Sequence, residues 1–158
     1  MAVHPFLDED SRVLTPEAFD FVLNNELKRA MRSQNYLTLL QIEATESIPD
    51  SVGPIELARE LARVVSREVR ETDLISRNDR GLLSVVLLDA DLPNSVRVLE
   101  RLLARFEHYE FTSARAIAVG AACCPTHGAD VESLRRAAEV RPMTTHHDER
   151  GSASNGKG

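Results

Sequence analysis

The sequence predicts an α+β domain in which helices pack on one face of a ferredoxin-like antiparallel sheet of about four to five strands. The first observation is the order of the periodic segments, which reads helix, strand, helix, hairpin, helix, strand, helix and fits a split βαβ arrangement. The second is that short apolar segments between polar turns alternate with longer segments of helical period. The third is the length of 158 residues, which suits one domain with a single core.

The first helix is expected over residues 14–32. Thr15 is a suitable N-cap, and Pro16 fits the first helical position. The apolar residues of this helix recur at spacings of three and four positions: Phe19, Leu23, Leu27, Ala30 and Met31.

Residues 36–44 (YLTLLQIEA) form a short apolar segment between polar flanks, which predicts a central strand.

The next segments predict a helix followed by a hairpin. Residues 47–53 contain proline, aspartate and glycine and are expected to form a loop, after which residues 55–69 carry the single apolar stripe of a helix. Residues 73–78 and 82–89 then form the two strands of a hairpin. Gly81 in the turn between them supplies a residue that tolerates positive φ.

The last third of the chain predicts a helix, a strand and a short closing helix. Residues 114–123 (ARAIAVGAAC) read as a strand of small side chains, so another element is expected to pack closely over it. A short helix is expected over residues 130–140. Before this strand, residues 92–108 are expected to be helical, with five apolar side chains turned inward: Val96, Leu99, Leu102, Leu103 and Phe106.

The domain is expected to span residues 1–141. From 142 to 158 the sequence loses its periodicity and fills with polar and small residues, which predicts a disordered tail. His146 and His147 beside Asp148 offer an alternative interpretation of part of this segment as a metal site.

Composition and charge exclude several classes of protein. The formal net charge of −6 argues against nucleic acid or an anionic membrane surface as a partner. No run of about 18 apolar residues occurs. The acidic start MAVHPFLDED lacks a secretory signal, so a cytoplasmic location is expected. Cys123 and Cys124 are interpreted as small buried residues in a reducing compartment, with a reactive or metal-binding role as the alternative.

The entry to the hairpin raises a question of function. Three arginines and two aspartates crowd the approach to its apolar second strand, and they either solvate the mouth of the hairpin or hold a ligand there. They are Arg70, Asp73, Arg77, Asp79 and Arg80.

The order of motifs resembles the bacterial GGDEF family of diguanylate cyclases from about residue 14 to about residue 138. Leu14-Thr15 stand before the first helix as in the family, although the asparagine-arginine loop that usually follows is missing. Residues 118–125 (AVGAACCP) resemble the family's fourth strand and the proline after it, and residues 134–137 (LRRA) match its closing helix. The resemblance implies a nucleotidyl-cyclase-like fold.

The family's metal-holding signature is lost. Its five positions fall on residues 79–83 (DRGLL), and the Asp-x-Asp at the end of the family's first strand reads QIE here. In the family these acids hold two divalent ions, which neutralise charge on the triphosphate during transfer. Gln41, Gly81 and Leu82 offer no carboxylate. We therefore expect no catalytic residue, no bound metal and no cofactor.

The resemblance also implies a ligand site. Family members often carry Arg-x-x-Asp ending six residues before the signature, where it binds the product cyclic di-GMP, and Arg70 and Asp73 have this spacing. An arginine fork satisfies the two acceptors on the Hoogsteen edge of guanine, and a carboxylate accepts from its Watson-Crick edge. Arg77 could reach a phosphate or a purine face, and Arg101 matches an arginine that completes this site across a partner.

The leading hypothesis is a catalytically inactive GGDEF-like domain that binds cyclic di-GMP and passes the signal to an unidentified effector protein. The turn at 77–81 (RNDRG) resembles that of the receptor in Pel-type exopolysaccharide export. Completion of the site by Arg101 of a second subunit would imply a ligand-linked homodimer. Three alternatives stay open: the arginine-aspartate pair is a solvated ion pair of less than about 1 kcal/mol, the domain is a scaffold that binds no nucleotide, or Glu43 and Asp79 support a residual cyclase.

Overall fold

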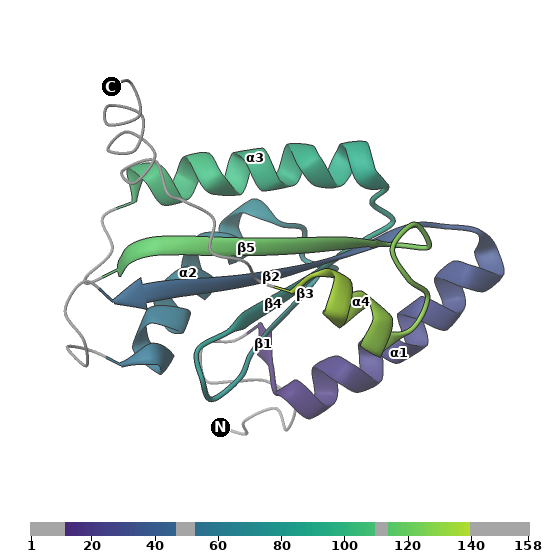
Figure 1. Ribbon diagram of the computed structural model, residues 1–158, viewed down its shortest axis with the longest axis horizontal. Helices are drawn as coiled ribbons and strands as arrows, with labels where there is room; N and C mark the ends of the chain where they lie inside the picture. Colours follow the sequence, from purple (N-terminus) through teal and green to yellow (C-terminus); the bar gives the residue numbers. More distant parts are fainter. Residues whose placement is uncertain (1–11, 47–52, 110–113, 140–158) are drawn as a thin grey trace, which may run out of the picture.

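A computed structural model describes residues 12–46, 53–109 and 114–139 of the chain. The tail expected over residues 142–158, with its two histidines, lies outside the described residues. Figure 1 shows the described elements, which follow in chain order: β1 (Val13–Leu14), α1 (Pro16–Ser33), β2 (Leu37–Glu46), α2 (Pro54–Glu68), β3 (Leu74–Arg77), β4 (Leu83–Leu88), α3 (Leu92–His108), β5 (Ala114–Cys124) and α4 (Val131–Ala137).

The strands form one five-stranded sheet in the order β1-β3-β4-β2-β5. β2 pairs antiparallel with β4 on one side and with β5 on the other, and β3 and β4 form the expected hairpin. The ferredoxin-like core and the interior position of β2 are confirmed. β1 adds a parallel pair with β3, which the sequence did not predict because two residues are too few to show a strand period.

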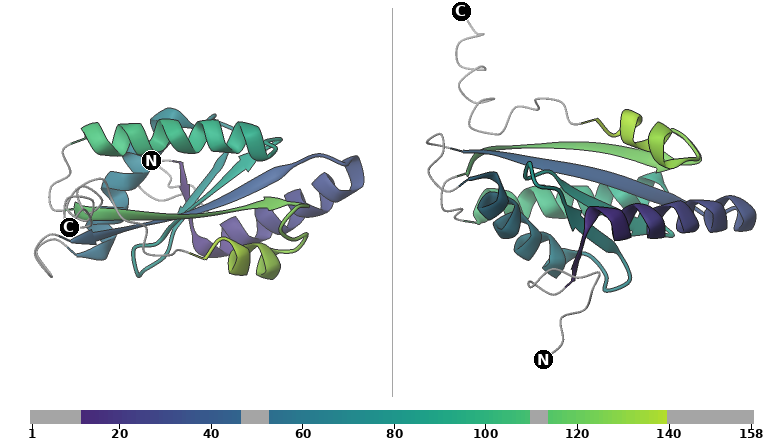
Figure 2. Two further views of the ribbon diagram at one scale, coloured as in Figure 1. Left: turned by 45° about the horizontal axis from the view of Figure 1, so that its top comes forward. Right: turned by 90° about the horizontal axis from the view of Figure 1, so that it is seen from below.

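Helices cover both faces of the sheet, which corrects the expectation of helices on one face only. Figure 2 shows α3 on one side of the sheet and α1 with α4 on the other. The cause lies in β2, where Leu40 and Ile42 join the hydrophobic cluster under α2 and α3, whereas Leu37 and Leu39 join the cluster under α1 and α4. A strand that is apolar on both sides is covered on both sides.

The helix boundaries follow the expected signals. Thr15 caps α1 by accepting a hydrogen bond from the backbone N–H of Ala18 at 3.2 Å, and Pro16 is the first helical residue. α3 has the expected bounds, and Asp91 caps it by accepting from the backbone N–H of Asn94 at 3.1 Å. None of the described helices is long and apolar enough to cross a membrane.

Two residues expected to face the core are exposed. Val96 is 43% exposed, because the buried position in this turn of α3 belongs to its neighbour Ser95, about 100° away around the helix. Ser95 tolerates burial because its hydroxyl hydrogen-bonds with the hydroxyl of Thr38 in β2 and with the Asp91 carbonyl. Met31 is 46% exposed at the end of α1, where the inward stripe ends at Ala30.

β5 is built from small side chains because the end of α4 packs directly on it. A Cβ atom added to Gly120 would lie 2.2 Å from the carbonyl oxygen of Ala138 and 2.7 Å from that of Glu139. Both distances are far inside van der Waals contact. The expected close packing over this strand is therefore confirmed, and Gly120 is the residue that permits it.

The two cysteines end β5 inside the core. Both are 0% exposed, and both are free thiols. Burial, and secondarily the neighbouring Cys123, raises the pKa of the Cys124 thiol, so this thiol stays protonated near neutral pH. The interpretation of Cys123 and Cys124 as small buried residues is confirmed.

Replacing Gly120 with alanine should destabilise the fold. We expect Gly120→Ala to lower the free energy of unfolding by about 1–3 kcal/mol, because α4 must shift to admit the methyl group. Urea denaturation followed by circular dichroism measures the change. Ala121→Ser, at an exposed position of the same strand, serves as the control and should change the stability by less than about 0.5 kcal/mol. Equal stability of the two variants would contradict the packing described.

Candidate functional site

Asp73 closes the connection between α2 and β3. Its backbone N–H donates to the carbonyl oxygen of Arg70 at 3.0 Å. Its carboxylate accepts from the N–H of Arg70 at 2.9 Å and from the N–H of Leu88 at 3.0 Å. The Asp73 side chain is only 3% exposed. The carboxylate therefore joins the end of α2 to the end of β4, in addition to any contact it makes with a ligand.

The Arg70 guanidinium lies over this turn and faces solvent. Its side chain is 62% exposed, and its Nη2 atom lies 3.8 Å from Oδ1 of Asp73. The same nitrogen donates to the carbonyl oxygen of Leu88. The aspartate thus fixes the base of Arg70, while most of the fork stays accessible to a ligand.

Arg101 reaches from α3 to the end of α2. Its Nη2 donates to the carbonyl oxygen of Glu68 at 2.7 Å, and its Nε lies 3.4 Å from the Glu68 carboxylate. Arg105, one turn later, donates to the same carboxylate at 2.6 Å. Glu68 is 11% exposed at its side chain, whereas that of Arg101 is 54% exposed. Arg101 therefore links the two helices and still presents part of its guanidinium to solvent.

One cavity brings three of the four expected ligand residues together. It measures about 400 Å³ and lies between the end of α2, the Asp73 turn, the end of β4 and the first half of α3. Ligand pockets commonly measure roughly 300–1,000 Å³. The residues with charged or polar side chains on its walls are Glu68, Arg70, Asp73, Asp89, Asn94, Arg97 and Arg101.

Arg97 adds a third cation to this cavity. It lies one turn before Arg101 on α3 and is exposed. Within the described part of the chain, no hydrogen bond or ion pair engages its guanidinium. By contrast, the acids Glu68 and Asp73 are held by arginines and backbone N–H groups. Asp89 is the one exposed acid among the residues of this cavity, against the exposed Arg70, Arg97 and Arg101. The accessible charge is therefore positive on balance, which favours an anionic ligand.

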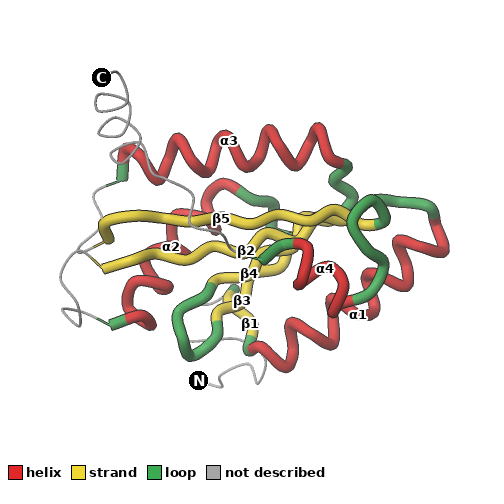
Figure 3. The backbone as a smooth tube through the Cα atoms, in the orientation of Figure 1, coloured by secondary structure: helices red, strands yellow, loops and turns green. Residues whose placement is uncertain are grey.

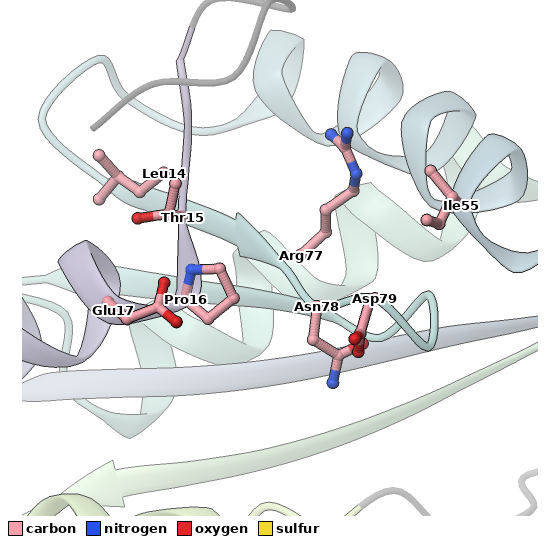
Figure 4. A pocket seen from close by; sticks show the side chains of 8 residues that line it. All are labelled: Leu14, Thr15, Pro16, Glu17, Ile55, Arg77, Asn78 and Asp79. Atoms are coloured by element: carbon pink, nitrogen blue, oxygen red, sulfur yellow. The ribbon is translucent and has the colours of Figure 1, made fainter. Parts of the chain in front are cut away.

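Arg77, the fourth expected ligand residue, lines a different cavity of about 530 Å³ between β1, the start of α1, the hairpin turn and the start of α2. Figure 4 shows its side chain on one side of the strand and those of Asn78 and Asp79 on the other. The separation follows from strand geometry, because four residues of extended chain span about 13 Å between Asp73 and Arg77. The structure thus does not bring Arg77 together with Arg70.

The hairpin turn binds its own backbone donors. The side-chain oxygen of Asn78 accepts from the N–H groups of Arg80 and Leu82, both at 2.9 Å, and its carbonyl oxygen accepts from Gly81 at 3.1 Å. Gly81 adopts the expected positive φ, at 93°. Figure 3 shows this turn at the opposite end of β3 and β4 from the connection to α3. Three successive N–H groups are therefore not free to bind a phosphate.

The positions that resemble the family's metal ligands lie on β2 and in the hairpin between β3 and β4, which the pairing of β2 with β4 places beside each other. Gln41 is 7% exposed on β2, where it pairs with Ser84 of β4 and Gly120 of β5. Glu43 and Asp79 are exposed. Across residues 12–46, 53–109 and 114–139, no three side chains of His, Cys, Asp or Glu gather as a metal site would require.

Two residues that contact the site were missed from the sequence. Glu68, the partner of Arg101, was not predicted. Arg12, just before β1, donates to the backbone of the Asp73 turn. Neither contact leaves a periodic signal, because the first depends on the pairing of α2 with α3 and the second on the pairing of β1 with β3.

No protein-family model matches the chain, and no curated protein sequence matches it. Solved structures do match its fold. The GGDEF domain of PA1120 (TpbB or YfiN) from Pseudomonas aeruginosa gives a TM-score of 0.72 at 19% identity, covering 84% of this chain and 83% of that one. A sensory box/GGDEF family protein from Caulobacter crescentus gives 0.70 at 18% identity, covering 92% and 99%.

A third match carries a nucleotide. The coiled coil and GGDEF domain of DgcB from Caulobacter crescentus, in complex with c-di-GMP, gives a TM-score of 0.70 at 16% identity, covering 92% of this chain and 81% of that one. The expected nucleotidyl-cyclase-like fold is therefore confirmed: the chain has the fold of GGDEF domains.

Asp73 should matter for the stability of the fold. We expect Asp73→Ala to lower the free energy of unfolding by about 3 kcal/mol, because the N–H groups of Arg70 and Leu88 lose a charged acceptor. Glu71→Ala, at an exposed position of the same turn, should change it by less than about 0.5 kcal/mol. Chemical denaturation measures both. An Asp73→Ala variant as stable as Glu71→Ala would show that the carboxylate does not hold this turn.

Proposed function

We propose that this chain is a catalytically inactive, cytoplasmic GGDEF-like domain that binds cyclic di-GMP in the cavity between α2 and α3. The observation that carries the proposal is the convergence of Arg70, Arg97 and Arg101 on one cavity beside the Asp73 turn, in a chain with the fold of GGDEF domains. The c-di-GMP complex of the DgcB domain, which shares this fold, adds support.

The chemistry of the cavity suits this ligand. A cyclic dinucleotide offers two phosphates and two guanines, so it needs cations for the phosphates and bidentate donors for the Hoogsteen edges. Arg70 is the exposed fork nearest the Asp73 carboxylate and is the candidate reader of a guanine. Arg97 and Arg101 supply the charge for the phosphates. Asp73 orders Arg70, and its remaining lone pairs can accept from the guanine.

The absence of cyclase activity is the second part of the proposal. It is supported by the neutral, buried Gln41 and by the hairpin N–H groups that Asn78 already occupies. Gly81 and Leu82 add no carboxylate at the turn. Phosphoryl transfer depends on metal ions and on oriented donors to the triphosphate, and both are weakened here. The receptor-like sequence RNDRG of this turn fits the same interpretation.

A scaffold domain that binds no nucleotide is the second candidate function. The observation in its favour is that the Asp73 carboxylate and the Arg101 guanidinium already have protein partners, so these residues can be explained by stability alone. On this view Arg70→Ala leaves the binding of an effector protein unchanged. On the receptor view, the same substitution abolishes the response of effector binding to cyclic di-GMP.

Arg77 and the homodimer remain predictions outside this cavity. Arg77 lines the second cavity, so it could contact the ligand only if a bound dinucleotide extended beyond the first. Arg101 already faces the cavity of its own chain, so a second subunit is not needed to bring it there. Sedimentation of the protein with and without cyclic di-GMP shows whether the ligand-bound protein is a monomer or a homodimer.

Calorimetric titration with cyclic di-GMP tests the receptor proposal. We expect the wild-type protein to bind and Arg70→Ala to bind about 5- to 150-fold more weakly, since one base-reading arginine contributes about 1–3 kcal/mol. Arg29→Ala is the matched control, because Arg29 is an exposed arginine on α1, on the other face of the sheet. Wild-type protein that shows neither heat nor a shift in melting temperature at saturating ligand would refute the receptor proposal.

Incubation with GTP and magnesium tests the loss of catalysis. We expect no cyclic or linear dinucleotide product by chromatography, while an active diguanylate cyclase run in parallel forms it, because the chain lacks the acids that hold two metal ions. Product formed by the wild type and lost in Glu43→Gln would instead establish the residual cyclase.

A further inference from the structure

Arg12 connects the start of the described chain to the turn that carries the candidate ligand residues. Its Nη2 donates to two backbone oxygens, that of Arg70 at 2.7 Å and that of Asp73 at 2.8 Å. Its Nη1 donates to the carbonyl oxygen of Ser66 at 3.3 Å. One guanidinium therefore holds both ends of the Arg70–Asp73 turn and the last turn of α2.

These contacts replace hydrogen bonds that the helix itself does not make. A continuing helix would direct the N–H of Arg70 to the carbonyl of Ser66, but this N–H donates to the Asp73 carboxylate instead. The Ser66 carbonyl accepts from Arg12. A cation is also favourable at this position, since the carbonyl end of α2 carries partial negative charge.

The backbone at Arg12 is held in register. The next residue, Val13, is 2% exposed and pairs in parallel with Ile75, and Leu14 pairs with Ser76. Because β1 and β3 run side by side, the side chain of Arg12 begins beside the residues that lead into β3. The Arg12 side chain therefore needs little rearrangement to reach the turn. This placement reduces the side-chain entropy that is lost when the guanidinium binds there.

We propose that Arg12 is a positioning residue for nucleotide binding, an inference that rests on the proposed function. The side chain of Arg70 is 62% exposed, and the direction in which it points is set by the backbone turn beneath it. Asp73 closes this turn from the sheet side, and Arg12 closes it from the side of β1. Without Arg12 the turn samples other conformations, and the ligand must order it on binding, which weakens the affinity.

Arg12→Ala tests the proposal, with Arg135→Ala as the matched control. Arg135 joins α4 to α1 through its ion pair with Asp20, and neither residue lines the ligand cavity. Both variants lose an arginine that bridges two elements, but only one loses contact with the site. In calorimetric titrations with cyclic di-GMP below the melting temperature of both variants, we expect about 10-fold weaker binding for Arg12→Ala and less than 2-fold change for Arg135→Ala.

Amide hydrogen exchange by NMR provides a readout without ligand. We expect the N–H groups of Arg70, Asp73 and Leu88 to exchange about 10-fold faster in Arg12→Ala and at the wild-type rate in Arg135→Ala. Arg12→Lys should be intermediate in affinity and exchange, because an ammonium keeps the charge but lacks the planar fork that spans Ser66 and the turn. It also serves as the test variant if Arg12→Ala does not fold.

The outcomes separate the two proposals. If the wild type binds cyclic di-GMP and Arg12→Ala binds it equally well, the role of Arg12 is overturned while the receptor function stands. If Arg12→Ala does not fold, equal binding by Arg12→Lys overturns the role in the same way. The role is also overturned if Arg135→Ala loses as much affinity as Arg12→Ala, because affinity would then follow general stability. If the wild type does not bind, the receptor function itself fails, and accelerated exchange in Arg12→Ala would then describe a purely structural clamp.

Discussion

The Asp73 carboxylate is the interaction on which the candidate site depends. By accepting from the N–H groups of Arg70 and Leu88, it fixes where α2 ends, where β3 begins and where β4 ends. A buried carboxylate is costly unless its charge is satisfied, and here two backbone donors and a nearby guanidinium satisfy it. The wall of the cavity and the direction of Arg70 both depend on this side chain, so a residue type suited to guanine recognition is equally suited to building the turn.

The structural and functional interpretations of the arginine-aspartate pair are therefore not exclusive. Arg70 and Asp73 differ in exposure. The side chain of Arg70 is 62% exposed and is open to a ligand, whereas that of Asp73 is 3% exposed and holds the turn. Arg101 combines both roles, since it binds Glu68 and also lines the cavity. A site assembled from contacts that also stabilise the fold is preorganised, and preorganisation lowers the cost of ordering the site when a ligand binds.

Much of the fold could be predicted from the sequence, because its elements carry strong local signals. Thr15 and Pro16 start α1, and α3 has the expected bounds. The prediction of helices on one face was wrong. The apolar residues of β2 face both sides of the sheet, but this pattern was interpreted only as that of a central strand. Val96 was misplaced because a serine can take a core position when Thr38 satisfies it. The separation of Arg77 from Arg70, and the contacts of Glu68 and Arg12, depend on tertiary pairing.

The hairpin turn is closed by the side chain of Asn78. Asn78 folds the turn inward on its own amides, so carboxylates introduced at positions 81 and 82 would stand beside a backbone that still faces Asn78. A variant that carried such acids would therefore also need a substitution of Asn78 before the amides of the turn could donate to a phosphate.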